Sequence, residues 1–84
     1  MRGAMVTILN RRHHGYDVRM YPGDHDPPHV QVWKGGKQVK IDLESMDVIS
    51  TSHAFHSREI RQIVNLLREH ESLLLSVWER LRKS

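Results

Sequence analysis

The chain has no cysteine among its 84 residues, which excludes disulfides, thiolate zinc sites and thiol nucleophiles. Long hydrophobic runs are also missing, since none approaches the roughly 18 apolar residues that a membrane span requires. The segment from Met1 to Met5 lacks the apolar core of a signal peptide. These absences predict a cytoplasmic protein that makes no use of a membrane.

Aromatic residues are scarce at 6%, and apolar residues make up 38% of the chain. A chain of this length buries enough surface for one core shared by a sheet and a helix, but not for a second domain or a deep pocket. We therefore expect a single domain over residues 1–84, with a disordered leader at 1–4. Any functional site should lie at the surface.

The net charge of +3 is unevenly distributed. Seven of the 13 Lys and Arg residues lie in residues 1–42, which hold only four of the ten Asp and Glu residues. An acidic partner or nucleic acid is therefore a candidate ligand of the first half of the chain. The simpler alternative is that a small net charge keeps a small domain soluble.

Alternating hydrophobicity predicts short strands at residues 6–9, 16–21, 30–34 and 37–43, with a weaker fifth at 47–51. Residues 10–15 are then a turn. Gly35 and Gly36 suit a two-residue hairpin loop, which fixes the register so that His29 faces Asp42. One face of this hairpin is apolar and forms the core. The other face is predicted to carry His29, Gln31, Trp33, Gln38, Lys40 and Asp42, beside Asp17, Arg19 and Tyr21.

From Ser57 the apolar residues recur three and four apart, which predicts a helix over residues 57–83 with Ser57 as N-cap and Glu59 in its first turn. Such a helix is about 40 Å long, whereas a six-residue strand is only about 20 Å long. No Gly or Pro marks a break, so we favour a helix that overhangs the sheet. The alternative is a break near residue 71.

The overhanging half would expose an apolar stripe that another copy or a partner protein must cover. The predicted interface consists of Leu74, Leu75, Trp78 and Leu81. The fold class that follows is α+β, an antiparallel meander of four or five short strands (residues 5–51) packed on one long C-terminal helix.

The pair of His29 and Asp42 has the chemistry of an oriented imidazole, because a carboxylate can fix the tautomer and stabilise the protonated ring. No nucleophile stands beside it, so no catalytic residue is assigned. His29, Asp42 and Lys40 are the candidates, and the alternative is a cross-strand pair that only stabilises the sheet.

The loop from Asp24 to His29 holds donors in a rigid frame, because Pro27 and Pro28 fix their own φ angles. His25 and His29 are weak metal candidates, since a structural site normally needs three or four ligands. We predict no metal and no other cofactor.

A cationic tip at Arg11 and Arg12 suits contact with an anion, and Trp33 could stack on a nucleic-acid base. The alternatives are a solvated turn and an aromatic packed on its strand neighbours. The residues predicted to bind a ligand are Arg11, Arg12, Arg19, His25, His29, Trp33 and Lys40.

The segment Asp24-His25-Asp26-Pro27-Pro28-His29-Val30-Gln31-Val32, with the preceding strand 16–21, resembles a family of short bacterial proteins catalogued as domain of unknown function 4160. The resemblance extends from Met5 to Glu79. Such proteins usually carry a second histidine two residues after Pro-Pro-His, where this chain has Gln31. The resemblance implies no established activity, only that such genes often lie beside a small partner gene, as toxin and antitoxin genes do.

Two functions follow as hypotheses. The first is a non-enzymatic interaction module of a toxin-antitoxin-like pair, which binds a partner protein, with nucleic acid as a further candidate ligand. The second is a small metal-independent ribonuclease, in which His29 is the general base and Lys40 or Arg19 stabilises the phosphate on the outer face of the sheet.

Overall fold

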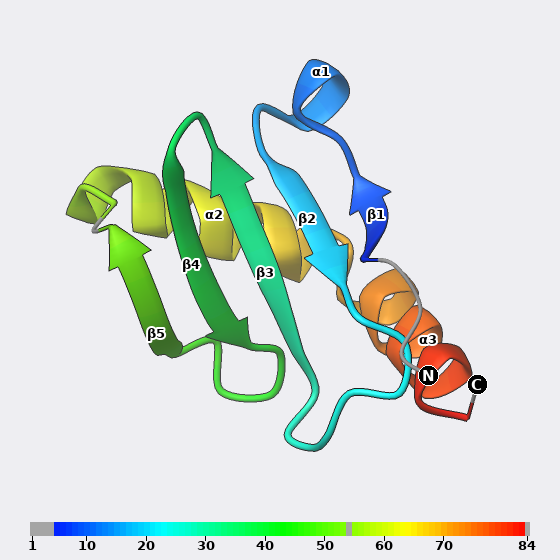
Figure 1. The fold of residues 1–84 in the computed structure, drawn as a ribbon. Helices are drawn as coiled ribbons and strands as arrows, with labels where there is room; N and C mark the ends of the chain where they lie inside the picture. Colours follow the sequence, from blue (N-terminus) through cyan, green and yellow to red (C-terminus); the bar gives the residue numbers. More distant parts are fainter. Residues whose placement is uncertain (1–4, 54, 84) are drawn as a thin grey trace.

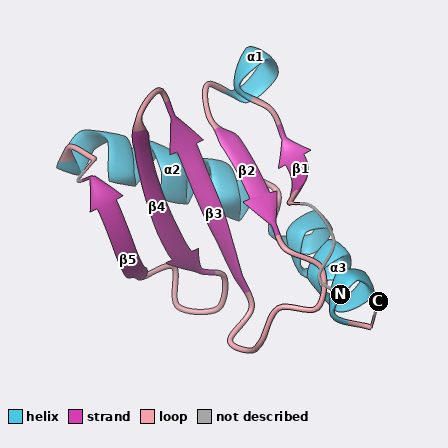
Figure 2. Cartoon of the chain, in the orientation of Figure 1, coloured by secondary structure: helices cyan, strands magenta, loops and turns pink. Residues whose placement is uncertain are grey.

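A computed structural model describes residues 5–53 and 55–83 and has the predicted α+β class. Its sheet is a five-stranded antiparallel meander in the order β1-β2-β3-β4-β5 (Figures 1 and 2). The predicted leader at 1–4 lies outside the described residues. The elements are β1 (Val6–Leu9), α1 (Arg11–His14), β2 (Asp17–Met20), β3 (His29–Lys34), β4 (Lys37–Asp42), β5 (Val48–His53), α2 (Ser57–Glu69) and α3 (Glu71–Arg82).

The hairpin of β3 and β4 has the predicted register, with Lys34 opposite Lys37 and His29 opposite Asp42. Gly35 adopts a φ of 60°, the left-handed conformation that glycine allows without steric cost. The predicted apolar face is buried: Val30, Val32 and Ile41 are 0% exposed and Val39 is 1% exposed. A slip of one residue would turn this whole face to solvent, so burial specifies the register.

Helix α2 crosses one face of the sheet and closes the core (Figure 1). Its fully buried residues, Ile63 and Leu67, belong to the same apolar cluster as the hairpin valines. In the described part of the chain, no helix covers the opposite face of β3 and β4 (Figure 1). The sheet therefore has one core face and one uncovered face.

The predicted turn at residues 10–15 contains one turn of helix, α1. The Asn10 side chain accepts a hydrogen bond from the His13 N–H at 3.0 Å, which caps the start of this turn. Gly15 ends it with a φ of 85° and donates its N–H to the Arg11 carbonyl.

The N-cap of α2 is His56, one residue before the predicted Ser57. The His56 Nδ1 accepts a hydrogen bond from the Arg58 N–H, and the Glu59 carboxylate accepts one from the His56 N–H. An imidazole nitrogen thus takes the acceptor role that a serine oxygen usually has in a capping box. Glu59 lies in the first turn as predicted.

The helical segment breaks at His70, so the continuous overhanging helix that we favoured is wrong and the alternative break near residue 71 is correct. His70 leaves the helical conformation at φ −117° and ψ 19°. Its Nδ1 lies 3.0 Å from the Leu66 carbonyl, and its ring packs against that of His14 with centroids 5.1 Å apart. Contacts of His70 hold the turn without Gly or Pro.

The break brings the distal apolar stripe back onto this chain's own core. Leu74 is 0% exposed and Trp78 is 2% exposed, while Leu75 and Leu81 pack partly buried against the same cluster. The overhang that led us to expect an interface with another chain is therefore absent. Self-association through what remains exposed of Leu75 and Leu81 stays a prediction.

No helix in the described ranges, 5–53 and 55–83, is long and apolar enough to span a bilayer.

Candidate functional site

His29 is the first residue of β3, and its side chain contacts both the preceding loop and α3. Its Nδ1 lies 2.8 Å from the Pro27 carbonyl, which can only accept, so Nδ1 is the donor. Its Nε2 lies 2.9 Å from the Asp24 carboxylate, and its ring centroid lies 5.0 Å from that of Trp78. His29 is 7% exposed. The loop and α3 together enclose it.

This environment corrects the expectation that His29 and Asp42 form a pair on the open face. The two residues are opposite each other in the ladder, but their side chains have other partners. The Asp42 carboxylate accepts hydrogen bonds from the N–H groups of Glu44 and Ser45, which stabilises the turn after β4. His29 instead faces α3, because the loop and that helix close over the start of β3.

The same loop is tied to the end of α3 by two further contacts. The Gly23 N–H donates to the Leu81 carbonyl at 2.9 Å, and Arg82 contacts the Asp26 carboxylate at 3.2 Å. His25, in the same loop, is exposed. The loop is therefore a joint between β3 and α3, and binding of a ligand by His25 and His29 stays a prediction.

The loop does not bring together a set of metal ligands. Across residues 5–53 and 55–83 there is no group of three or more His, Asp or Glu residues placed to hold a metal ion.

The uncovered face of the sheet brings together three of the predicted binding residues. Arg19 on β2 is opposite Gln31, which is opposite Lys40 on β4, so the three form one row across the strands. Trp33 lies in the adjacent row, and the Arg19 guanidinium sits 5.4 Å from the centre of its ring. A cation over an indole face is an attractive contact. Arg19, Trp33 and Lys40 are called the open-face set below.

Two donors of the open-face set lack acceptors. Within the described residues, the Arg19 Nε and the Trp33 Nε1 are buried and have no hydrogen-bond partner. The other end of the Arg19 guanidinium is occupied, since Nη2 lies 3.2 Å from the Asp17 carboxylate. A buried donor without an acceptor costs about 1–3 kcal/mol. The uncovered face therefore carries a local deficit of hydrogen-bond acceptors.

The remaining predicted binding residues lie elsewhere. Arg11 and Arg12 are exposed on α1, beyond the start of β2, whereas His25 and His29 belong to the loop at the opposite end of that strand (Figure 1). The Asp17 carboxylate accepts a hydrogen bond from the Arg11 backbone N–H at 2.7 Å, which links α1 to the open face. The predicted set is therefore divided among three places.

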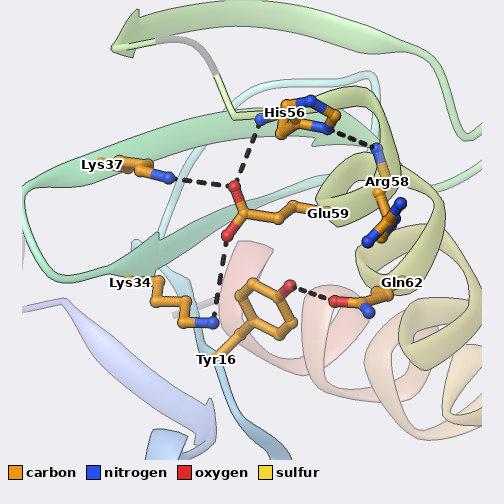
Figure 3. A network of polar contacts seen from close by, with 7 residues as sticks. All are labelled: Tyr16, Lys34, Lys37, His56, Arg58, Glu59 and Gln62. Carbon is orange, nitrogen blue, oxygen red and sulfur yellow. Dashed lines mark hydrogen bonds and ion pairs between the residues drawn. The ribbon is translucent and has the colours of Figure 1, made fainter.

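A second polar network lies where the turn between β3 and β4 meets the start of α2 (Figure 3). The Lys37 Nζ donates to the Glu59 carboxylate at 2.9 Å, and the Lys34 Nζ lies 3.9 Å from its other oxygen. The hydrogen bond from Lys37, followed by that from the His56 N–H, lowers the pKa of Glu59 below its ordinary 4.5. The network fastens the hairpin to α2.

Tyr16 extends this network at the edge of the core. Its hydroxyl donates to the Gln62 side chain at 2.9 Å, and the Lys34 Nζ lies 5.1 Å from its ring centre. Burial raises the pKa of the Tyr16 hydroxyl, and the negative charge of Glu59 raises it further. Of this network, only the first-turn position of Glu59 is predicted by the sequence pattern.

The sequence also missed Asp24 as the partner of His29. A signal was present, because an Asp five residues before a His in a proline-rich loop can fold back onto the imidazole. The cross-strand pairing of His29 with Asp42 was the stronger pattern, and it identified the backbone neighbour rather than the side-chain partner.

Comparison with known proteins gives one match. No curated protein and no solved structure matches this chain. Residues 15–79, which include all of β2 to β5, α2 and most of α3, match a family described as a domain of unknown function. The chain therefore belongs to the family Domain of unknown function (DUF4160).

Proposed function

We propose that this protein is a non-enzymatic interaction module of a toxin-antitoxin-like pair, and that its open-face set binds an acidic surface of the partner protein. The observation that carries the proposal is the stack of Arg19 on Trp33, in which two N–H donors have no acceptor among the described residues. A partner carboxylate supplies those acceptors. The gene-pair context comes from the family resemblance.

The chemistry of the open-face set favours a carboxylate over a neutral group. Arg19 already holds the Asp17 carboxylate through Nη2, so its guanidinium has the geometry for this ligand type. Its side chain is 32% exposed, which leaves it room to turn Nε toward an incoming acceptor. Lys40 adds a second cation in the same row. Trp and Arg are also the side chains that most often dominate binding energy at interfaces.

Apolar surface at the edge of the sheet supports a protein partner. Val48 and Ile49 on the edge strand β5 are 43% and 47% exposed, and Val48 is opposite the core residue Ile41. Protein interfaces combine an apolar centre with polar and charged contacts. An edge strand also offers unpaired backbone groups to a partner chain.

The contacts of His29 support a non-enzymatic module over the ribonuclease alternative. A general base needs a nitrogen free to take a proton from the substrate. Both nitrogens of His29 already face oxygen atoms of this chain, and the ring is buried beneath Trp78. The row of Arg19, Gln31 and Lys40 across β2 to β4 contains no histidine.

Isothermal titration of the purified product of the neighbouring gene tests the proposal. Arg19→Ala should weaken binding at least tenfold, because it removes the guanidinium and uncovers Trp33. Arg61→Ala, on the far side of the sheet, is the matched control and should leave the affinity unchanged. Equal affinity for wild type and Arg19→Ala, or no binding by the wild type, would overturn the proposal.

The ribonuclease alternative has its own test. Wild-type protein incubated with RNA in EDTA should leave the RNA intact. Cleavage that disappears in His29→Gln, with the thermal unfolding transition retained, would replace the interaction module by the enzyme.

A further inference from the structure

We infer that the exposed side of α2 is a binding surface for duplex DNA, formed by Arg58, Arg61, Asn65 and Arg68. This set is called the α2 stripe below. All four residues are exposed, and they follow one another at spacings of three, four and three. At 3.6 residues per turn these spacings place the four side chains within an arc of about 80°.

The α2 stripe points away from the sheet. Ile63 and Leu67 fix the buried side of the helix, at 0% exposure each. The helical period turns the centre of the stripe about 140° from Leu67. The stripe therefore lies on the outer surface of the molecule, on the side of the sheet opposite the open-face set (Figure 1).

The cations of the α2 stripe are not used inside the protein. Among the residues that the structure describes, none of the three arginines forms an ion pair. In Figure 3 the dashed line to Arg58 ends at its backbone N–H. The acid nearest the start of α2, Glu59, is taken by Lys34 and Lys37. No ion pair among the described residues therefore neutralises the three arginines, and the exposed acid on the same side of α2 is Glu69 at its C-terminal end.

The positions of Arg58 and Arg61 are unfavourable for the stability of α2. Arg58 and Arg61 are like charges at spacing three, which is a repulsive pair on a helix. Both lie near the N-terminus of α2, where the helix dipole disfavours cations. Helix stability therefore does not explain Arg58 and Arg61, although it favours Arg68 in the last turn of α2, and a bound anion would reverse both unfavourable effects.

The residue types of the stripe favour duplex DNA over a carboxylate surface. A helix of about 10–12 Å diameter fits the major groove, which is about 12 Å wide. Arginine holds phosphate in a bidentate fork and also reads guanine, while asparagine reads adenine through two hydrogen bonds. Asn65 stands between arginines on the stripe and adds nothing to the attraction of an acidic protein.

The α2 stripe and the open-face set lie on opposite sides of the sheet, so partner protein and DNA can be bound together. The inference does not rest on the proposed function. It uses other residues and a different ligand, and either can fail alone.

Fluorescence anisotropy with a labelled random-sequence DNA duplex of about 20 base pairs tests the inference. Wild type should bind at 50 mM salt, and log K should fall with log salt at a slope near −2.7, from about −0.9 for each of three arginine contacts. The double variant Arg61→Gln/Arg68→Gln should lose at least tenfold in affinity and reduce the slope to about −0.9.

Two controls separate the α2 stripe from general charge and from folding. Lys83→Gln removes one positive charge from the end of α3, outside the α2 stripe, and should bind duplex like wild type. The double variant should retain the wild-type thermal transition, since both side chains are exposed and neither forms an ion pair among the described residues. A double variant that fails to fold is replaced by Arg68→Gln alone, which should weaken binding at least threefold.

Three results would overturn the inference. The first is no binding of the duplex at 50 mM salt. The second is binding that the double variant leaves unchanged. The third is equally tight binding of poly-glutamate, lost through the same substitutions, which would identify the α2 stripe as a surface for acidic proteins instead.

Discussion

The two tryptophans of this chain each have a buried indole N–H without an acceptor among the described residues, but one lies in the core and the other on the uncovered face of the sheet. Trp78 on α3 is 2% exposed and packs on His29, inside the joint between the loop and the helix. Trp33 on β3 lies on the uncovered face of the sheet beneath Arg19.

The difference shows that the consequence of an unsatisfied buried donor depends on the groups that surround it. Around Trp78 the burial of a large ring offsets the missing hydrogen bond, because such burial stabilises by about 1.5–3 kcal/mol or more. Around Trp33 no element of the described chain lies over the face, so a partner can present an acceptor once the partly exposed Arg19 side chain moves aside. The Trp78 donor lowers the stability of the core, whereas the Trp33 donor can gain an acceptor when a partner binds.

The largest effect is expected from removing the core tryptophan. Trp78→Ala should lower the free energy of unfolding by about 3–5 kcal/mol, because it leaves a cavity between α3 and His29. For a domain of this size the melting temperature should fall by at least about 12 °C in a thermal scan.

Trp33→Ala is the matched change on the open face. It should cost only about 1 kcal/mol, since the side chain is partly exposed and no helix packs on it. Equal losses for the two variants would erase the distinction between the regions. Trp78→Phe provides a measurable transition where Trp78→Ala does not fold.

The next largest effect on stability is expected at the joint between the loop before β3 and helix α3. His29→Leu should cost about 1–3 kcal/mol in denaturant unfolding, because it leaves the Asp24 carboxylate and the Pro27 carbonyl without their donor. Asp24→Asn should cost less, since an amide oxygen still accepts from Nε2. The reverse order would mean that the Asp24 charge, not the imidazole, holds the loop to α3.

A smaller effect is expected at the ion pair of Lys37 and Glu59. The lowered pKa of Glu59 means that its contribution to stability is present above pH 4.5 and is lost as the pH falls through the folded-state value. Glu59→Gln should therefore be less stable than wild type at neutral pH. The gap between the two proteins should narrow below pH 4.5 when unfolding is measured across the acid range, and a constant gap would contradict the ion pair.

The sheet could be predicted from the sequence because its signals are local. Gly35 and Gly36 fix the loop, and the alternation on each side of them fixes which residues are buried. Both signals act over a few residues, so a single sequence carries them completely. The helical region carries no comparable signal for its break, because His70 turns the chain through contacts with Leu66 and with the ring of His14.

The candidate site was predictable only where strand register decides it. Arg19 and Lys40 were correctly placed on one face, because period-two alternation reaches that far. The position of His29 was not, since α3 returns to cover it only after the break at His70. A tertiary contact across about fifty residues leaves no pattern in the strand itself.

The most direct test of the account follows the two indole N–H signals by NMR. The ¹⁵N-labelled protein is titrated with the neighbouring gene product, and Trp33→Phe and Trp78→Phe assign the signals. Binding should move the Trp33 signal, because its donor gains an acceptor, and should leave that of Trp78 in place. Movement of Trp78 with Trp33 unchanged, or of neither while the proteins associate, would contradict the claim that the open face of the sheet is the binding surface.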